Sequence, residues 1–468
     1  MAFQKLLIQY LLDPLANITS RIPQKAKDAG FVAFFLCIIL LYMGRGAALL
    51  NFRYLIFFAL GCLSLGGMIL CSLPAQVKPV VFRKPLLLIW LGIGAFMLLS
   101  AFLYNSDYLP ESLLFLVAYP IIFIVWNQGN RAKLFKQLFC GIEISFWLYL
   151  LVCLLFYPVE DVRYSGLFTN VNGTAGYLAL VAVCLLADCL DFKKITAYKI
   201  RKLIAFGICT ALLLYTGSRT GILELVVVAV GAAVVSFFRL CRRGKVYLLR
   251  NALLIVASVF LFFHTTMYGL QYGYRAKTKV VTSIQGIIST TPNDGNDNPL
   301  LPDSSQQTRP EDSADLINDR FDTDGKNLSQ FSTGRIQIWK GYAAQLNLFG
   351  HPDSGTVSFF VGDTEKIYHT THMTILQIAY ENGIIAGALY LLFNLTAGIY
   401  SLIHALRHKN DPYAIVPLLI SLAYGVYALL ANTVSSFWYI CTLMYYLAQS
   451  PIMVKSQVSL EAGETDIP

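Results

Sequence analysis

The sequence STGRIQIWKGY, residues 332–342, and the sequence THMTILQIAYENGIIAG, residues 371–387, decide how the rest of the chain can be arranged. They carry an arginine, Arg335, and a histidine, His372, and the second sequence runs directly into a hydrophobic segment. Both lie at the end of a long polar segment, in a chain of 468 residues that is 56% hydrophobic and 13% charged. Because soluble domains carry about 25% charged residues, this composition predicts a polytopic membrane protein.

Twelve apolar stretches have about the 20 residues that a membrane-spanning helix needs. They predict an all-α integral membrane protein of about twelve transmembrane helices, nine before the long polar segment and three after it. The first 29 residues are interrupted by Asp13 and Pro14, and we expect them to form an amphipathic segment at the membrane surface. The twelve stretches lie near residues 30–50, 54–74, 85–104, 110–126, 137–157, 174–191, 201–216, 221–240, 248–268, 383–405, 412–432 and 434–450.

The basic residues predict which way the chain faces, because cytoplasmic loops are enriched in Lys and Arg. Outside the long polar segment, 23 basic residues fall on the side of the N-terminus, and only Arg45, Arg53, Arg163 and Arg219 fall on the other side. Both termini are therefore predicted to be cytoplasmic, and this bias also accounts for the net charge of +9. The predicted parts are a cytoplasmic interfacial segment (1–29), spans one to nine (30–268), a large extracytoplasmic loop (269–382), spans ten to twelve (383–450) and a cytoplasmic tail (451–468).

The large loop is predicted to have two parts. Residues 290–329 are rich in Asp, Asn, Pro and Ser and are expected to be disordered, and the spacing of their aspartates matches no EF-hand calcium loop. Residues 331–382 are expected to be helical and to carry the catalytic groups, with one amphipathic helix over residues 331–348. A second helix is expected to start near Thr371 and to continue into the tenth span. The ten cysteines have no CxxC spacing, so they indicate neither a disulfide framework nor a zinc site.

Two motifs before the large loop could carry chemistry on the predicted outer face. The sequence RYSGLFTNVNGTAGYLAL, residues 163–180, places Arg163, Asn170 and Asn172 before the sixth span. These residues could bind an anion at the helix N-terminus, or the asparagines could simply cap the helix. Ser218 and Arg219 lie in a tight turn between two spans, where the arginine could bind phosphate or reach lipid headgroups.

The third group of candidates comes from the opening sequences. Trp339 suits an anchor at the membrane interface, four residues after Arg335. We expect His372 in the first turn of a helix, where the helix dipole disfavours protonation, and a neutral imidazole can act as a general base. A metal site with His369 is disfavoured, because no Cys or carboxylate follows His372 at the next helical positions. Arginines that bind phosphate and a histidine that accepts a proton suit transfer from a lipid diphosphate to a hydroxyl.

These motifs follow a known order along the chain. The matching residues are Arg163-Tyr-Ser-Gly-Leu-Phe-Thr-Asn170-Val-Asn172, Ser218-Arg219-Thr-Gly, Thr333-Gly334-Arg335-Ile-Gln-Ile-Trp339, and His372-Met-Thr-Ile-Leu376 with Gly383 downstream. In this order and composition the sequence resembles the O-antigen ligase and O-antigen polymerase superfamily. Val171 stands where that pattern has proline, and Met373 where it has asparagine.

The resemblance implies an integral-membrane glycosyltransferase with a GT-C-like fold. It would transfer a glycan from undecaprenyl diphosphate to an acceptor hydroxyl at the outer face of the cytoplasmic membrane, with inversion and without a metal ion or cofactor. Its partners would be this donor, a glycan or lipid-core acceptor and the bilayer, and not nucleic acid. By carry-over, the catalytic residues are His372, Arg335 and Arg219, and the substrate-binding residues are Arg163, Asn170, Asn172, Ser218 and Trp339.

The nature of the acceptor stays open at this stage. A ligase, a polymerase and a protein-directed O-oligosaccharyltransferase share the same chemistry and are not separated by these residues. An alternative from another class is a transporter or flippase of a lipid-linked or anionic substrate. That alternative predicts charged groups near the middle of the membrane and internal repeats, and the sequence shows few of the former and none of the latter.

Overall fold

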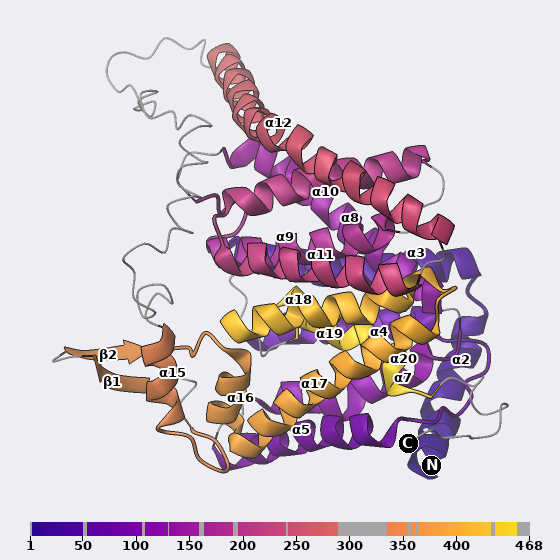
Figure 1. The fold of residues 1–468 in the computed structure, drawn as a ribbon. Helices are drawn as coiled ribbons and strands as arrows, with labels where there is room; N and C mark the ends of the chain where they lie inside the picture. The colour runs from indigo at the N-terminus through magenta and orange to yellow at the C-terminus, as the bar shows by residue number, and fades with distance from the viewer. Residues whose placement is uncertain are drawn as a thin grey trace.

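The computed structural model is an almost entirely α-helical bundle, which confirms the predicted all-α membrane fold (Figure 1). Two predicted features lie outside the residues that it describes: the acidic segment at 290–329 and the end of the tail at 456–468. The structure describes residues 2–49, 54–104, 108–129, 131–158, 163–190, 195–239, 242–288, 335–352, 357–361, 364–431 and 436–455.

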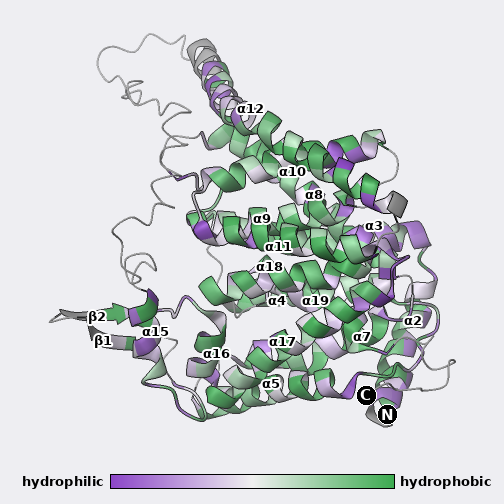
Figure 2. Ribbon diagram, in the orientation of Figure 1, coloured by the Kyte–Doolittle hydropathy of each residue, from purple (hydrophilic) through white to green (hydrophobic). Residues whose placement is uncertain are grey.

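Within the described residues, ten helical segments are long and apolar enough to cross a membrane. Hydrophobic residues cover the bundle helices along most of their length, and hydrophilic residues gather near the helix ends (Figure 2). The ten segments are α3 (Gln24–Gly46), α4 (Tyr54–Ser72), α5 (Lys84–Leu103), the continuous α6, η3 and α7 (Leu109–Trp126), α8 (Arg131–Phe156), α9 (Val171–Cys189), α11 (Arg219–Arg239), α12 (Arg242–Ile288), α17 (Ile384–Arg407), and η4 (Pro412–Ile415) with α18 (Val416–Leu430).

The other two predicted spans are also helical, but they lack the length or the composition of a span. The first, α10 (Ala197–Tyr215), carries three basic residues in its first two turns. The second, α19 (Ile440–Ala448), has nine residues, or about 14 Å of helix, and is followed by the short α20 (Ser450–Met453). Because the hydrocarbon core of a bilayer is about 30 Å thick, α19 is too short to cross it alone.

The basic residues of α10 are held by carboxylates of two neighbouring helices. The Lys202 side chain is 2% exposed, and its Nζ lies 2.9 Å from Oε2 of Glu143 in α8 and 2.7 Å from Oδ2 of Asp188 in α9. Arg201 contacts both carboxylate oxygens of Glu143, at 2.9 and 3.1 Å. Such pairing compensates for the cost of placing charges within a membrane bundle, so α10 packs between α9 and α12 despite its charges.

The two ends of the bundle are built from different parts of the chain. At one end lie α1 (Ala2–Leu7), η1 (Ile8–Leu12), α2 (Asp13–Ser20) and α20, and we call it the terminal end (Figure 1). At the other lie α15 (Arg335–Ala343), the strands β1 (Val357–Val361) and β2 (Thr364–Tyr368), and α16 (Thr374–Asn382), and we call it the site end. This arrangement places the motif-bearing loops opposite the N-terminal helices, and the N-terminal segment buries residues at helical spacing, namely Ile8, Leu12, Ala16 and Thr19.

The site end contains three features that differ from expectation. Helix α12 continues to Ile288 for 47 residues, about 70 Å, and projects beyond its neighbours within the region expected to be loop (Figure 1). Strands β1 and β2 form an antiparallel hairpin in which Val357 pairs with Tyr368. Helix α16 ends before Gly383, whose φ of 92° favours glycine, so α16 does not run on into α17.

Candidate functional site

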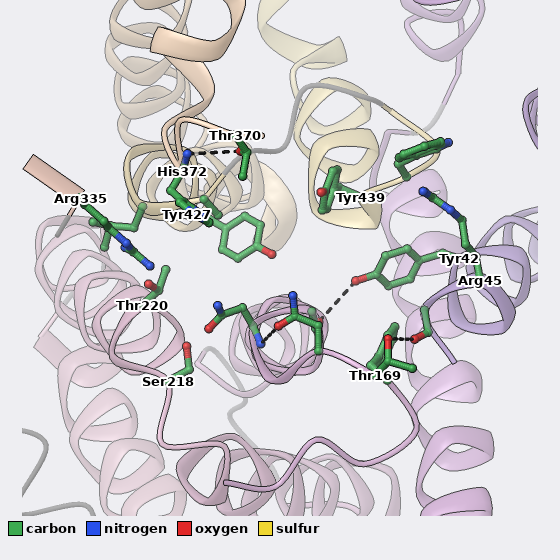
Figure 3. A pocket seen from close by; sticks show the side chains of 18 residues that line it. Tyr42, Arg45, Thr169, Ser218, Thr220, Arg335, Thr370, His372, Tyr427 and Tyr439 are labelled. Carbon is green, nitrogen blue, oxygen red and sulfur yellow. Dashed lines mark hydrogen bonds between the residues drawn. The ribbon is translucent and has the colours of Figure 1, made fainter. Parts of the chain in front are cut away.

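A cavity of about 420 Å³ lies at the site end, between the ends of several bundle helices and the loop before α16 (Figure 3). Five residues singled out by the sequence motifs line it, although they are far apart along the chain. No Asp or Glu is among the described residues that line the cavity. The five are Asn170, Asn172, Ser218, Arg335 and His372.

His372 does not lie in the first turn of a helix, as the sequence argument expected. Helix α16 begins at Thr374, and His372 precedes it in the connection from β2 with a φ of 53°. This left-handed backbone conformation is uncommon for a residue with a side chain, and surrounding contacts must maintain it. His372 therefore precedes the helix, and its side chain lines the cavity.

A set of hydrogen bonds on Thr371 maintains the loop that carries His372. The indole of Trp339 donates to the Thr371 carbonyl at 3.0 Å, and the Thr371 amide donates to Oε1 of Gln377 at 2.8 Å. The Thr371 hydroxyl donates to the Met373 carbonyl at 2.7 Å and accepts from the Met373 amide at 3.1 Å. Trp339 therefore stabilises the loop through its hydrogen bond to Thr371 and does not line the cavity.

The environment of His372 favours the neutral imidazole. Burial lowers the pKa of His372 below its usual value of 6.5, and the positive charge of Arg335 lowers that pKa further. The direction is the one expected from the sequence, but the cause is different, because the expected helix dipole is replaced by burial and a neighbouring cation. A neutral imidazole has a free lone pair and can accept a proton.

Arg335, whose charge acts on His372, has Arg219 as a second neighbouring cation. Burial lowers the pKa of Arg335, and the charge of Arg219 lowers that pKa further, so the two guanidinium groups lie close enough to repel. Arg219 itself does not line the cavity, whereas Ser218 and Thr220 on either side of it do. A bound anion between the two guanidinium groups would relieve this repulsion.

Asn170 and Asn172 are joined by a hydrogen bond, and both line the cavity. Asn170 is the N-cap of α9, and its Oδ1 accepts a hydrogen bond from the backbone N–H of Asn172 at 2.9 Å. Asn170 and Asn172 also line the cavity. Capping and ligand binding, which the sequence left as alternatives, are thus compatible at this helix terminus.

Arg163 lies apart from the cavity that holds His372. It lines a second cavity, of about 240 Å³, together with aromatic residues such as Tyr157 and Tyr274. The Nε of Arg163 donates to the Thr216 carbonyl at 3.3 Å. The structure therefore separates Arg163 from Arg335, with which the motif pattern had grouped it.

Sequence reasoning missed the side of the cavity formed by Tyr42, Arg45, Trp438 and Tyr439. The one signal that could have found it is the charge distribution, since Arg45 is one of four basic residues outside the large loop that are predicted to lie on the outer side. The aromatic residues lie in apolar stretches and carry no local signal. As for metals, the described residues contain no group of three or more His, Cys, Asp or Glu side chains suited to hold an ion.

One comparison with known protein families gives a match. Residues 204–391 match the family model described as O-antigen ligase. This match supports the O-antigen ligase and polymerase superfamily. The ligase match contains Arg219, Arg335 and His372, and ends before Tyr439. No curated protein matches the chain. The family indicates a membrane-embedded enzyme of glycan transfer, with a lipid-linked glycan donor and an acceptor.

Proposed function

We propose that this protein transfers a glycan from undecaprenyl diphosphate to an acceptor hydroxyl, at the outer face of the cytoplasmic membrane, without a metal ion and with inversion. The observation that carries the proposal is the single cavity lined by His372 and Arg335, with Arg219 beside Arg335. The family match supports glycan transfer of the O-antigen ligase or polymerase type. The orientation rests on the distribution of basic residues, which favours cytoplasmic termini and an outer site.

His372 is the proposed general base. As the acceptor oxygen attacks the anomeric carbon, its proton passes to the imidazole. The bond from that carbon to the diphosphate oxygen breaks, and its electron pair stays on the diphosphate. A single displacement of this kind inverts the anomeric centre, as in single-step glycosidases. The lowered pKa of His372 keeps the base unprotonated at neutral pH.

Arg335 and Arg219 are the proposed binding groups for the diphosphate. A guanidinium group donates two parallel hydrogen bonds to phosphate oxygens, which fixes both the position and the orientation of the leaving group. Negative charge grows on the diphosphate as the anomeric bond breaks, so fixed cations stabilise the transition state more than the bound donor. The absence of Asp and Glu from the described cavity lining is consistent with an anionic ligand.

The proposal is tested with purified protein in lipid nanodiscs, given undecaprenyl-diphosphate glycan and an acceptor. Wild type is compared with His372→Ala, Arg219→Ala and Arg335→Ala, and both the elongated product and the released lipid diphosphate are quantified. Each variant is expected to lose about 100-fold or more in kcat. Full turnover by all three variants would contradict the mechanism. Movement of intact donor between leaflets, with no transfer by wild type, would favour a flippase.

His351→Ala is the matched control for His372→Ala. His351 also belongs to the site end, where its ring stacks on Tyr380 at 4.1 Å between centroids, and it does not line the cavity. We expect this variant to keep its kcat. Thermal unfolding of every variant then separates lost chemistry from lost folding.

A further inference from the structure

We infer that one half of the cavity, formed by Tyr42, Arg45, Trp438 and Tyr439, is a binding site for a sugar ring. We call these four residues the aromatic half, and Arg335, His372 and Thr220 the catalytic half. Figure 3 shows Tyr42, Arg45 and Tyr439 on the side of the cavity opposite to Arg335, His372 and Thr220. The aromatic half lies outside the residues that match the ligase model. The inference rests on the proposed function for the chemistry of the catalytic half.

The guanidinium of Arg45 is fixed against aromatic rings. Its Cζ lies 3.0 Å from the centroid of the Trp438 ring and 5.6 Å from that of the Phe57 ring. A cation over an aromatic face is stabilised by the ring quadrupole, and the effect is strongest for tryptophan. An arginine that is already immobilised loses little conformational entropy when it binds a ligand.

The fold builds this half by docking the end of α3 on the loop before α9. The Gly46 carbonyl accepts hydrogen bonds from the Thr169 amide at 2.9 Å and from the Thr169 hydroxyl at 3.2 Å. A Cβ atom on Gly46 would overlap the Phe168 ring, so the close approach requires glycine. The Tyr42 hydroxyl donates to the Gly173 carbonyl at 3.4 Å, and its ring lies 5.3 Å from that of Phe168. The aromatic half is therefore preformed.

The residue types of this half favour a sugar over a second phosphate. A pyranose has apolar C–H faces, which pack on aromatic rings, and hydroxyl groups, which bond to guanidinium, phenol and carboxamide groups. Asn170 and Asn172 supply carboxamides on the same cavity wall. A phosphate would gain from Arg45 and from phenol donors, but not from the apolar faces of the three aromatic rings. The volume of about 420 Å³ falls within the usual 300–1,000 Å³ range of small-molecule pockets, and it extends across both halves.

A sugar here could belong to the acceptor or to the donor, and kinetics in nanodiscs distinguish the two. We expect Arg45→Ala to raise the KM of one substrate about 10- to 100-fold, as for loss of a hydrogen bond to a charged group, with a much smaller change in kcat. Arg45→Lys should recover only part of the loss, because the ammonium lacks the planar fork. A raised acceptor KM assigns the acceptor sugar, and a raised donor KM assigns the sugar next to the diphosphate. Unchanged KM values for both substrates in Arg45→Ala would overturn the inference.

Inorganic pyrophosphate separates this inference from the proposed function. Pyrophosphate should inhibit by occupying the catalytic half, so Arg335→Ala should weaken inhibition and Arg45→Ala should not. Equal weakening by both variants would place Arg45 in the diphosphate site and overturn the sugar site, while leaving the proposed chemistry intact. Lys277→Ala is the matched control, because Lys277 also lies over an aromatic ring, 4.5 Å from the centroid of Phe156, and does not line the cavity.

A binding measurement keeps the inference testable without turnover. The free oligosaccharide released from the donor by mild acid is titrated into wild type, Arg45→Ala and Lys277→Ala by calorimetry. Binding by wild type and the Lys277 variant, with at least 10-fold weaker binding by Arg45→Ala, supports the sugar site even if transfer is never observed. Equal binding by all three proteins, or no binding by any of them to either this oligosaccharide or the acceptor glycan, contradicts it.

Discussion

Two groups of charges, in different parts of the bundle, have opposite compositions. Between α8, α9 and α10, Lys202 and Arg201 each contact a carboxylate, and Glu143 and Asp188 complete the network within the fold. In the cavity at the site end, Arg335 and Arg45 contribute positive charge to a wall that has no carboxylate among its described residues. The charges of the first group balance one another within the fold, whereas the charges of the second line a cavity.

This difference suggests that the Lys202 network stabilises the fold, whereas the charges in the cavity are suited to bind a ligand. Paired ions in a membrane bundle offset each other's desolvation and hold helices together. Cations gathered on a concave wall instead create a positive potential in which an anionic or hydroxyl-rich ligand is favoured. The two groups should therefore respond differently to mutation, with loss of stability in one and loss of activity in the other.

The largest effect is expected from His372→Ala in the cavity. Loss of the proposed general base should lower kcat by about 10²- to 10⁴-fold, while the melting temperature changes little because the imidazole closes no ion pair with a described residue. Steady-state transfer assays and thermal unfolding in nanodiscs measure the two quantities on the same preparation. A large fall in melting temperature with an unchanged kcat would reverse the comparison.

Lys202→Ala should show the opposite pattern. Removal of the central cation leaves Glu143 and Asp188 buried without it, and the free energy of unfolding should fall by about 3–5 kcal/mol. The control combines Lys202→Met with Glu143→Gln and Asp188→Asn, which removes all three charges and should recover much of the stability. Denaturant titration provides the measurement, and wild-type stability in Lys202→Ala would show that the network is dispensable.

Glu381 is a buried carboxyl group whose hydrogen-bond partners are neutral, and the pH dependence of stability tests its pKa. Its Oε1 accepts from Nε2 of Gln377 at 2.6 Å, and burial raises the pKa of Glu381 from 4.5 to about 7. Because the folded-state pKa is the higher one, this group contributes stability below pH 4.5 that is lost as the pH rises through 7. Glu381→Gln should therefore be more stable than wild type at pH 8, by up to about 3 kcal/mol.

Unfolding measured from pH 5 to pH 8 checks this expectation. The difference between Glu381→Gln and wild type should grow across this range and level off above pH 7. A difference that does not change with pH would mean that Glu381 titrates normally. Since Gln377 also accepts from the Thr371 amide, Glu381→Leu should disturb the His372 loop and lower kcat, whereas Glu381→Gln should not.

The smallest effect is expected in the pH dependence of Arg335→Ala. The charge of Arg335 lowers the pKa of His372, so its removal should raise that pKa and move the acidic limb of the kcat profile to higher pH. A shift of about one pH unit or less is expected, measured on the residual activity. Arg335→Lys retains the charge and should keep the limb near its wild-type position. An unmoved limb in Arg335→Ala would mean that burial alone sets the pKa.

Much of the fold follows from local sequence, and the exceptions have clear reasons. Apolar stretches of about 20 residues predict helices because the length of a span is a local property. The β1–β2 hairpin and the extension of α12 were not predicted, because neither segment has the apolar length of a span. The close packing of Gly273 in α12 against the Leu154 carbonyl, where a Cβ would approach to 2.5 Å, is visible only in three dimensions.

The candidate site was predicted in part. The motifs named Arg335, His372 and Ser218, which the fold brings to one cavity from separate segments. They also named Arg163 and Trp339, of which one lines another cavity and the other supports the His372 loop. The motifs carried no distances, so they grouped Arg163 and Trp339 with residues that line the cavity.

The sequence by itself determined the membrane class, most of the helical spans and the types of residue available for chemistry, because hydrophobic length and side-chain chemistry belong to single stretches of chain. Only the tertiary structure decided which cations face carboxylates and which face a cavity, because that depends on neighbours from other helices. It also decided the conformation of His372, whose φ of 53° is maintained by hydrogen bonds to Thr371 from two other segments. Arg45 is a candidate ligand-binding residue only because the end of α3 packs on the loop before α9, which places it at the cavity.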